Sequence, residues 1–214
     1  AEDKVEASDN SGEKSSVTEI GNVNSSVVVT DVTSTVKEVM PSIVSVSSTV
    51  TATYRTYFGQ AMKESAPADG SGIIIAQNDS ELLIATNHHV IENADAGSIS
   101  IKFNDGSSAT ANLKGADEDM DLAIVAVALK DLSSDTLKSI KIAALGDSSS
   151  LQLGEPVIAI GNALGYGQSV TTGVVSAIDR EVQSKDGSVN TYIQTDAAIN
   201  PGNSGGTLFN GKGE

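Results

Sequence analysis

The chain has 214 residues, enough to bury one large hydrophobic core or two smaller ones. Its formal net charge of −15 at pH 7 repels phosphate backbones, so we do not expect nucleic acid as a partner. There is no cysteine, and His88 and His89 are the two histidines, which excludes a disulfide scaffold, a thiolate zinc site and a cysteine nucleophile. We therefore expect neither a metal nor an organic cofactor.

The N-terminal residues 1–27 are polar, acidic and rich in Ser and Asn, without sustained periodicity, and they predict a disordered acidic tail or tether. A short helix is expected next, capped by Thr30 or Asp31 and ended by Pro41. Its apolar stripe consists of Val32, Val36 and Val39. No run of about 18 apolar residues follows, and the chain does not start like a signal peptide, so we expect any leader or anchor to have been removed or left out.

From Ser42 onward the pattern changes to short apolar or alternating runs, which are typical of strands separated by tight turns. Strands are predicted within 42–51, 70–77, 81–86, 98–103, 109–113, 121–127, 156–161, 169–178, 191–196 and 206–209. No helix between them is long enough for parallel β-α-β units. The pattern therefore predicts two successive antiparallel β units.

The expected organisation is a helix and first β unit over 28–130, a polar link over 131–145 and a second β unit over 146–214. This second unit is expected to be incomplete, because its last hairpin lacks a second strand. Asn210-Gly211 is a strong hairpin signal, but little chain follows it. We expect either that the sequence is cut short or that another polypeptide supplies the rest.

The segment Gly202–Gly206 is the sharpest chemical signal. A nucleophilic serine needs an exposed hydroxyl and backbone N–H groups directed at the developing oxyanion, and flanking glycines permit the tight backbone that this requires. Ser204 is therefore the candidate nucleophile. Gly202 and Ser204 are the candidate N–H donors of an oxyanion hole, with Asn203 between them.

A serine nucleophile needs a base and a carboxylate that orients the base. His88 and His89 follow an apolar strand, and one of them is the candidate base. Of the acids before the apolar run 122–125, Asp121 is the one expected to be carried into the interior. The other acids, Asp117, Glu118 and Asp119, are interpreted as solvated turn charges.

Several segments resemble the HtrA/Deg family of trypsin-like serine proteases. ATNHHVI (85–91) resembles the family's Thr-Asn-x-His-Val segment and so points to His89, and DMDLAIV (119–125) resembles its Asp-Leu-Ala-Val segment and supports Asp121. YIQTDAAINPGNSGG (192–206) is similar to the nucleophile segment over its whole length. The resemblance also covers GNALGYGQSVTTGVVSAIDR (161–180) and VTSTVKEVMPSIVSV (32–46).

The resemblance implies an all-β fold of two antiparallel six-stranded barrels of the chymotrypsin type, the second incomplete in this chain. It implies a catalytic triad of His89, Asp121 and Ser204 in the cleft between the barrels. In trypsin-like proteases the residue six positions before the nucleophile lies at the base of the primary pocket, which here is Ala198. With Ile199 and Asn200, Ala198 is the expected substrate-binding segment, suited to small aliphatic residues.

The resemblance further implies that unfolded or damaged proteins are cleaved outside the cytoplasm, in a bacterial envelope or after secretion, as part of protein quality control. A homotrimer, a PDZ domain and a C-terminal segment are expected by resemblance alone. One alternative is a dormant or chaperone-like module on the same fold. Another is a glutamate-specific hydrolase of the same fold, which would need cations or a further histidine in its pocket.

The aromatic residues Tyr54, Tyr57 and Phe58 lie in the connection between the first two expected strands. In the family this loop can extend toward a neighbouring subunit's active site. Ordinary half-buried strand residues are the alternative interpretation.

Overall fold

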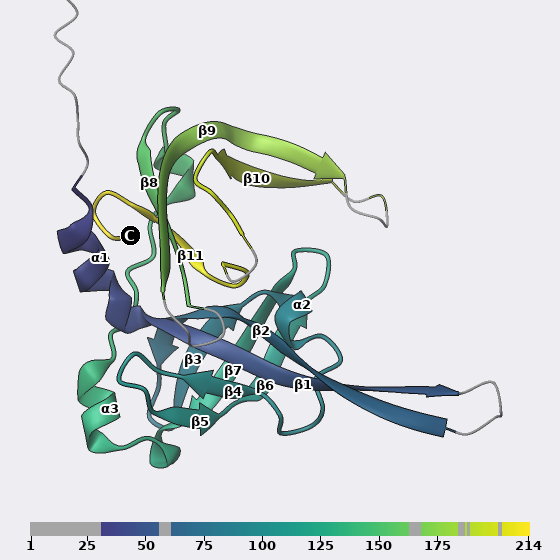
Figure 1. Cartoon of the computed structure of the whole chain (residues 1–214). Coiled ribbons are helices and arrows are strands. Elements are labelled where there is room, and N and C mark those ends of the chain that lie inside the picture. The colour runs from purple at the N-terminus through teal and green to yellow at the C-terminus, as the bar shows by residue number, and fades with distance from the viewer. Residues whose placement is uncertain (1–30, 56–60, 163–167, 184–186, 188, 201–202) are drawn as a thin grey trace, which may run out of the picture. The chain divides into compact units, whose positions relative to one another are not determined.

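The computed structural model describes residues 31–55, 61–162, 168–183, 187, 189–200 and 203–214, and it gives no side chains for residues 52, 54 and 55. The tail predicted over 1–27 lies outside the described residues, as do Tyr57, Phe58, Gly202 and the side chain of Tyr54. The described part contains two curled antiparallel sheets (Figure 1). None of its helices is long and apolar enough to cross a membrane.

The helices and strands follow each other as the strand-rich pattern predicts. The helices are α1 (Thr33–Val39), α2 (His88–Ile91) and α3 (Ser134–Ser139), with 3₁₀ turns at Met40–Ser42, Leu129–Asp131 and Ser148–Ser150. The strands of the first sheet are β1 (Ile43–Arg55), β2 (Ala61–Gln77), β3 (Glu81–Thr86), β4 (Ser100–Lys102), β5 (Ser108–Thr110), β6 (Asn112–Asp117) and β7 (Leu122–Ala128). Those of the second are β8 (Pro156–Gly161), β9 (Ser169–Gln183), β10 (Val189–Thr195) and β11 (Thr207–Asn210).

The predicted N-terminal helix is confirmed as α1, but the predicted cap by Asp31 is wrong: the N-cap residue is Val32, and no side chain caps the helix. Thr30, the other predicted cap, lies outside the described residues. The Asp31 carboxylate accepts the N–H of Thr33 at 3.0 Å. The pKa of Asp31 is lowered, most by the side-chain hydrogen bond from Thr33 and next by this backbone one. Pro41 lies in the 3₁₀ turn that follows α1, where its missing N–H is tolerated. The helix ends at Val39, which is buried, and the 3₁₀ turn leads into β1.

The first sheet has the strand order β5-β4-β1-β2-β3-β7-β6. Its two outermost strands, β5 and β6, are separated in sequence by Ala111 alone. Ala111 is buried, and its N–H donates to the Ile99 carbonyl at 2.9 Å. β5 and β6 therefore form one strand that bends at Ala111 and closes the sheet into a barrel. The sheet has seven strands rather than the predicted six because Ala111 interrupts the pairing and divides this strand in two.

Alternating side chains fill this barrel, since every second residue of a strand points to the same face. In β3 the pattern buries Leu82 and Ile84 completely, and in β7 it buries Val125 and Val127. Val90 and Ile91 of α2 pack into the same core. Because these two residues are anchored, the first turn of α2 is held against the barrel.

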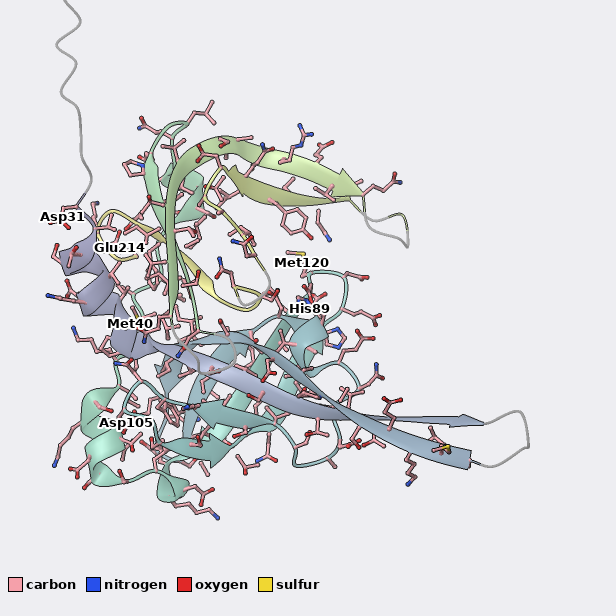
Figure 2. All side chains as sticks on the ribbon, in the orientation of Figure 1. Asp31, Met40, His89, Asp105, Met120 and Glu214 are labelled. Carbon is pink, nitrogen blue, oxygen red and sulfur yellow. The ribbon has the colours of Figure 1, made fainter. Side chains whose placement is uncertain are left out.

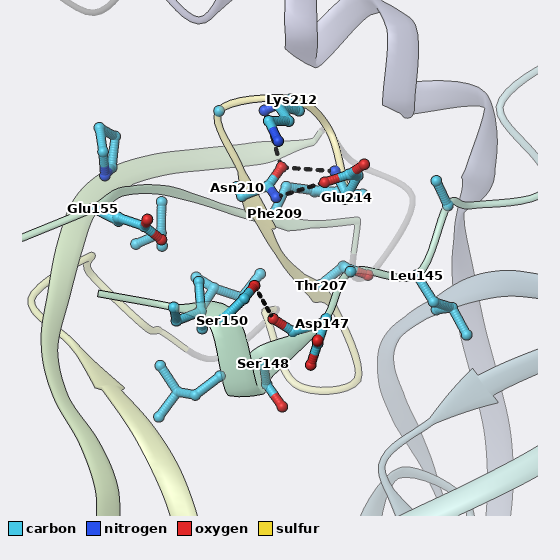
Figure 3. Close-up of a pocket in the computed structure, with 18 of the residues that line it drawn as sticks. Leu145, Asp147, Ser148, Ser150, Glu155, Thr207, Phe209, Asn210, Lys212 and Glu214 are labelled. Carbon is cyan, nitrogen blue, oxygen red and sulfur yellow. Dashed lines mark hydrogen bonds between the residues drawn. The ribbon is translucent and has the colours of Figure 1, made fainter. Parts of the chain in front are cut away.

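The second sheet has the order β10-β9-β8-β11, so β11 pairs with β8 and forms an edge among the described residues. The predicted turn after β11 is present. Asn210 Oδ1 accepts the N–H groups of Lys212 and Glu214, at 2.9 and 3.0 Å, and Asn210 N–H donates to the Glu214 carbonyl at 2.9 Å (Figure 3). A cavity of about 460 Å³, lined in part by Leu145, Leu208 and Phe209, runs beside this edge. The second barrel is incomplete in this chain, as predicted.

An apolar cluster joins the two sheets. Ile43 and Ile73 of the first sheet pack with Ile158, Ile160 and Phe209 of the second, and all five are nearly or fully buried. Burial of such side chains is worth about 1.5–3 kcal/mol each. This cluster fixes the relation of the two sheets, on which the candidate site depends.

Candidate active site

His89 and Asp121 lie just beyond the ends of two adjacent antiparallel strands, β3 and β7. β3 ends at Thr86 and α2 begins at His88, while Asp121 directly precedes β7. Thr86 pairs with Ala123 across the two strands. The end of β3 and the start of β7 therefore lie at the same edge of the barrel, which brings His89 next to Asp121. His89 lies on the side of the first barrel that faces the second sheet (Figure 2).

The two side chains are in direct contact. Asp121 Oδ2 lies 2.8 Å from His89 Nδ1, and Asp121 Oδ1 accepts the backbone N–H of His89 at 2.9 Å. The expectation that Asp121 would be carried into the interior is wrong, since 43% of its side chain is exposed. Asp121 lies in the turn before β7, with φ of +51°, rather than in the strand.

His88 lies beside His89 but faces a different environment. Its backbone N–H donates to the Asp121 carbonyl at 3.1 Å. Among the described residues its imidazole makes no hydrogen bond, whereas that of His89 meets the carboxylate. The geometry therefore distinguishes the two adjacent histidines.

The peptide group that joins Ser204 to Gly205 is held at both ends. The Ser204 carbonyl accepts the N–H of Ser71 at 2.7 Å, and the Gly205 N–H donates to Asn87 Oδ1 at 2.6 Å. Gly205 has φ of +75°, and a Cβ at this position would overlap the Ser71 carbonyl and the Thr86 hydroxyl. The glycine after the candidate nucleophile is thus required both by its backbone conformation and by the close approach of β2 and β3.

Close packing at Gly70 brings the nucleophile segment to the histidine segment. A Cβ on Gly70 would lie 2.6 Å from Val90 Cγ2 and 2.9 Å from the Ser204 carbonyl oxygen. Val90 directly follows His89. The histidine segment and the nucleophile segment therefore both contact β2 at Gly70, where there is no room for a side chain. Among the described residues no hydrogen bond joins the Ser204 hydroxyl to His89; such contacts often tighten only when substrate binds.

The residues predicted for the oxyanion hole are described in part. Gly202 lies outside the described residues. Asn203 is buried, its N–H donates to the Asn200 carbonyl at 3.0 Å, and its Nδ2 donates to the Ala198 carbonyl at 3.2 Å. The N–H of Asn203 therefore closes a turn of the loop, while its side chain anchors the preceding segment.

The predicted substrate-binding residues differ in their surroundings. The Ala198 carbonyl also accepts the Thr171 hydroxyl at 2.9 Å, which ties this segment to β9. The side chain of Ile199 is 62% exposed and lines a cavity of about 230 Å³ together with Ile193 and Thr207. Ala198 and Asn200 do not line that cavity. Of the three predicted residues, Ile199 alone contributes a side chain to this cavity.

Sequence reasoning did not single out three residues that connect the parts of the site, namely Ser71, Thr86 and Asn87. The Thr86 hydroxyl donates to the Ser71 carbonyl at 2.7 Å, and Ser71 Oγ accepts the Asn162 N–H at 2.6 Å. The pattern Gly70-Ser71-Gly72 was the available signal, since glycines on both sides of a strand residue mark a close approach of other backbone.

Comparisons with known proteins point to one family. Residues 70–214 match the family model of the trypsin-like peptidase domain. The chain is 39% identical over 188 residues to the serine protease Do-like HtrA of Bacillus subtilis, covering 84% of this chain and 40% of that protein. It is 46% identical over 145 residues to a probable periplasmic serine protease do/HhoA-like of Haemophilus influenzae, covering 68% and 29%.

Solved structures give the same result. A variant of the HtrA-type protease AlgW with a decapeptide superposes with a TM-score of 0.68 at 31% identity, covering 85% of this chain and 55% of that one. The chain thus spans 40% of the Bacillus relative and about half of the solved one. The chain belongs to the trypsin-like peptidase family and, within it, to the HtrA/Deg serine proteases.

Proposed function

We propose that the chain carries the catalytic unit of a serine endopeptidase, with Ser204 as nucleophile, His89 as general base and acid, and Asp121 as the carboxylate that orients His89. The observation that supports this most directly is the double contact of Asp121 with His89, at an edge where Asn87 and Ser71 hold the Ser204–Gly205 peptide. Family membership supports the same assignment.

The proposed mechanism follows from these positions. With Nδ1 hydrogen-bonded to Asp121, the imidazole presents Nε2 as the proton acceptor. His89 takes the Ser204 proton as the hydroxyl attacks the peptide carbonyl, then gives it to the leaving amine. A water molecule then releases the acyl group by the same route.

Backbone N–H groups would stabilise the tetrahedral oxyanion. We assign this role to the N–H groups of Gly202 and Ser204, since that of Asn203 is used by the Asn200 carbonyl. Asn203 would act by anchoring the loop, because its buried side chain donates to the Ala198 carbonyl. Removal of one oxyanion donor typically costs about 10²–10³-fold in kcat.

The primary pocket would accept small aliphatic side chains. Ala198 places no charge at the predicted base of this pocket, and the exposed Ile199 adds an apolar wall. A pocket without a counter-charge does not compensate the desolvation of Lys, Arg or Glu. The segment 198–200 would therefore select Val, Ala or Ile before the scissile bond.

The proposed substrates are unfolded or damaged proteins outside the cytoplasm. Relatives that carry the word periplasmic in their names, and solved relatives that hold a decapeptide or a tripeptide, support this proposal. A homotrimer, with a PDZ domain in the longer protein, is proposed from family membership alone.

A dormant state of the same site is the alternative. The absence of a hydrogen bond between the Ser204 hydroxyl and His89, both of them described residues, is the observation that favours it. In such a state the protein would bind unfolded chains without cleaving them. The two states differ in whether Ser204 reacts.

The test is labelling of the intact protein with a fluorophosphonate, together with cleavage of a heat-unfolded protein. Wild type should label at Ser204 and cleave the substrate, and Ser204→Ala should do neither. Ser176→Ala, at an exposed serine of β9, is the matched control and should behave as wild type. Cleavage by Ser204→Ala would refute the proposed site, and binding without labelling by wild type would establish the dormant alternative.

A further inference from the structure

One side chain links the segment of the candidate acid to that of the candidate nucleophile. Asn87 Nδ2 donates to the backbone carbonyl of Asp121 at 2.7 Å, and Asn87 Oδ1 accepts the backbone N–H of Gly205 at 2.6 Å. Asn87 precedes His88 and His89, so it also belongs to the histidine segment. All three parts of the proposed triad therefore meet at this amide.

We propose that Asn87 is a positioning residue, which holds the backbones of Asp121 and of the Ser204–Gly205 peptide in the arrangement that turnover requires. This inference rests on the proposed function. Asn87 would not touch the reacting atoms. It would act through the two backbones to which its amide is bonded.

The chemistry of the two partners explains why an amide is needed. The Gly205 N–H requires an acceptor, and the Asp121 carbonyl requires a donor, so the orientation of the amide is fixed by its partners. A carboxylate of the same shape accepts from Gly205 but confronts the Asp121 carbonyl with a second acceptor. An apolar side chain of similar size satisfies neither group.

The two bonds restrain the groups that must be placed accurately. With the Ser204 carbonyl bonded to Ser71 and the Gly205 N–H bonded to Asn87, the peptide plane after the nucleophile has no freedom to rotate. On the other side, Asp121 has φ of +51°, and its carbonyl accepts from both His88 and Asn87. Loss of the amide would release both backbones, and a displacement of about 1 Å at a reacting centre can cost about 10²-fold in rate.

The chain offers a matched control in Asn104. Its Oδ1 accepts the Nε2–H of Gln168 at 2.7 Å, so Asn104 also links the first barrel to the second sheet through its side chain. Neither Asn104 nor Gln168 is bonded to a residue of the proposed triad. A general effect of removing a link between the sheets would appear in Asn104 variants as well.

The experiment compares Asn87→Leu, Asn87→Asp and Asn104→Leu with wild type in the intact protein, using a chromogenic peptide for kcat and KM and thermal unfolding for Tm. Both Asn87 variants should lose about 10–100-fold in kcat, with KM within about twofold of wild type. Asn104→Leu should keep wild-type kcat. Asn87→Asp preserves side-chain volume and the bond to Gly205, so it tests the inference if the leucine variant does not fold.

Three outcomes would overturn the inference. The first is a wild-type kcat in either folded Asn87 variant, and the second is a loss of kcat/KM that comes wholly from a higher KM. The third is a loss of kcat in Asn104→Leu as large as that in the Asn87 variants. Failure of the proposed function would look different. In that case Ser204→Ala would retain activity, or wild type would have none, whatever the Asn87 variants do.

Discussion

The carboxylate of Asp121 contacts His89 with both of its oxygens: Oδ2 lies 2.8 Å from the ring Nδ1, and Oδ1 accepts the backbone N–H at 2.9 Å. A carboxylate that meets ring and backbone together fixes the rotation of the imidazole as well as its tautomer. This relationship differentiates His89 from His88, whose ring makes no hydrogen bond among the described residues. Substitutions of His89 and Asp121 should therefore affect turnover far more than substitutions of their neighbours His88 and Asp119.

His89→Ala should lower turnover by about 10⁴-fold or more, because the proposed base is lost and only binding and the oxyanion hole remain. His88→Ala should stay close to wild type. Turnover of a peptide substrate by each purified variant measures the difference. The opposite ranking would show that the base has been assigned to the wrong one of two neighbours.

Asp121→Asn should cost about 10⁴-fold in kcat, since an amide that donates toward Nδ1 presents the wrong tautomer to Ser204. The fold should survive, because Asn tolerates the left-handed backbone seen here at φ of +51°. Kinetics and circular dichroism on the same sample test both statements. Asp119→Asn is the control, and a comparable loss there would contradict the assignment of Asp121.

Gly205→Ala should both destabilise the protein and remove activity. The positive φ costs a non-glycine residue about 1–3 kcal/mol, and the added Cβ also meets the Ser71 carbonyl and the Thr86 hydroxyl. Gly106→Ala is a matched control, because Gly106 has φ of +85° but open space around its Cβ position. Thermal unfolding should show a larger decrease in Tm for Gly205→Ala than for Gly106→Ala. Equal decreases would mean that the positive φ, and not the overlap of the added Cβ, causes the loss of stability.

The cleavage profile of a peptide library should show small aliphatic residues before the scissile bond, with a broad preference, because each methylene of fit is worth about 1–3 kcal/mol. Ile199→Ala should widen acceptance toward Leu and Phe, since the Ile199 side chain lines the cavity beside the nucleophile segment. A dominant preference for Lys, Arg or Glu in the wild-type profile would refute the proposed pocket.

Asp105 should titrate at a pKa below its ordinary value. The side-chain hydrogen bond from Ser107 lowers the pKa of Asp105 most, since Oδ1 accepts the Ser107 hydroxyl at 2.6 Å and its N–H at 2.9 Å. A carboxyl with a depressed pKa contributes stability above its unfolded pKa of about 4, and this contribution is lost as the pH falls through the folded pKa. Carboxyl chemical shifts followed by NMR should show the pKa rising toward its ordinary value in Ser107→Ala, and no change would contradict the role given to this bond.

The sequence by itself determined the strand-rich fold in two units, the helix before β1, the turn after β11 and the candidate residues of the site. These features depend on neighbours along the chain: the alternation that buries Leu82 and Ile84, the glycines around Ser204, and the presence of only two histidines.

Only the tertiary structure decided how these parts meet. It placed Asp121 in an exposed turn, closed the first barrel at Ala111, and gave Asn87 its two partners. The bond from Gly205 to Asn87 joins residues 118 positions apart, so no local pattern encodes it. It exists because buried side chains such as Ile73 and Ile160 hold the two sheets together and bring their loops within hydrogen-bonding distance.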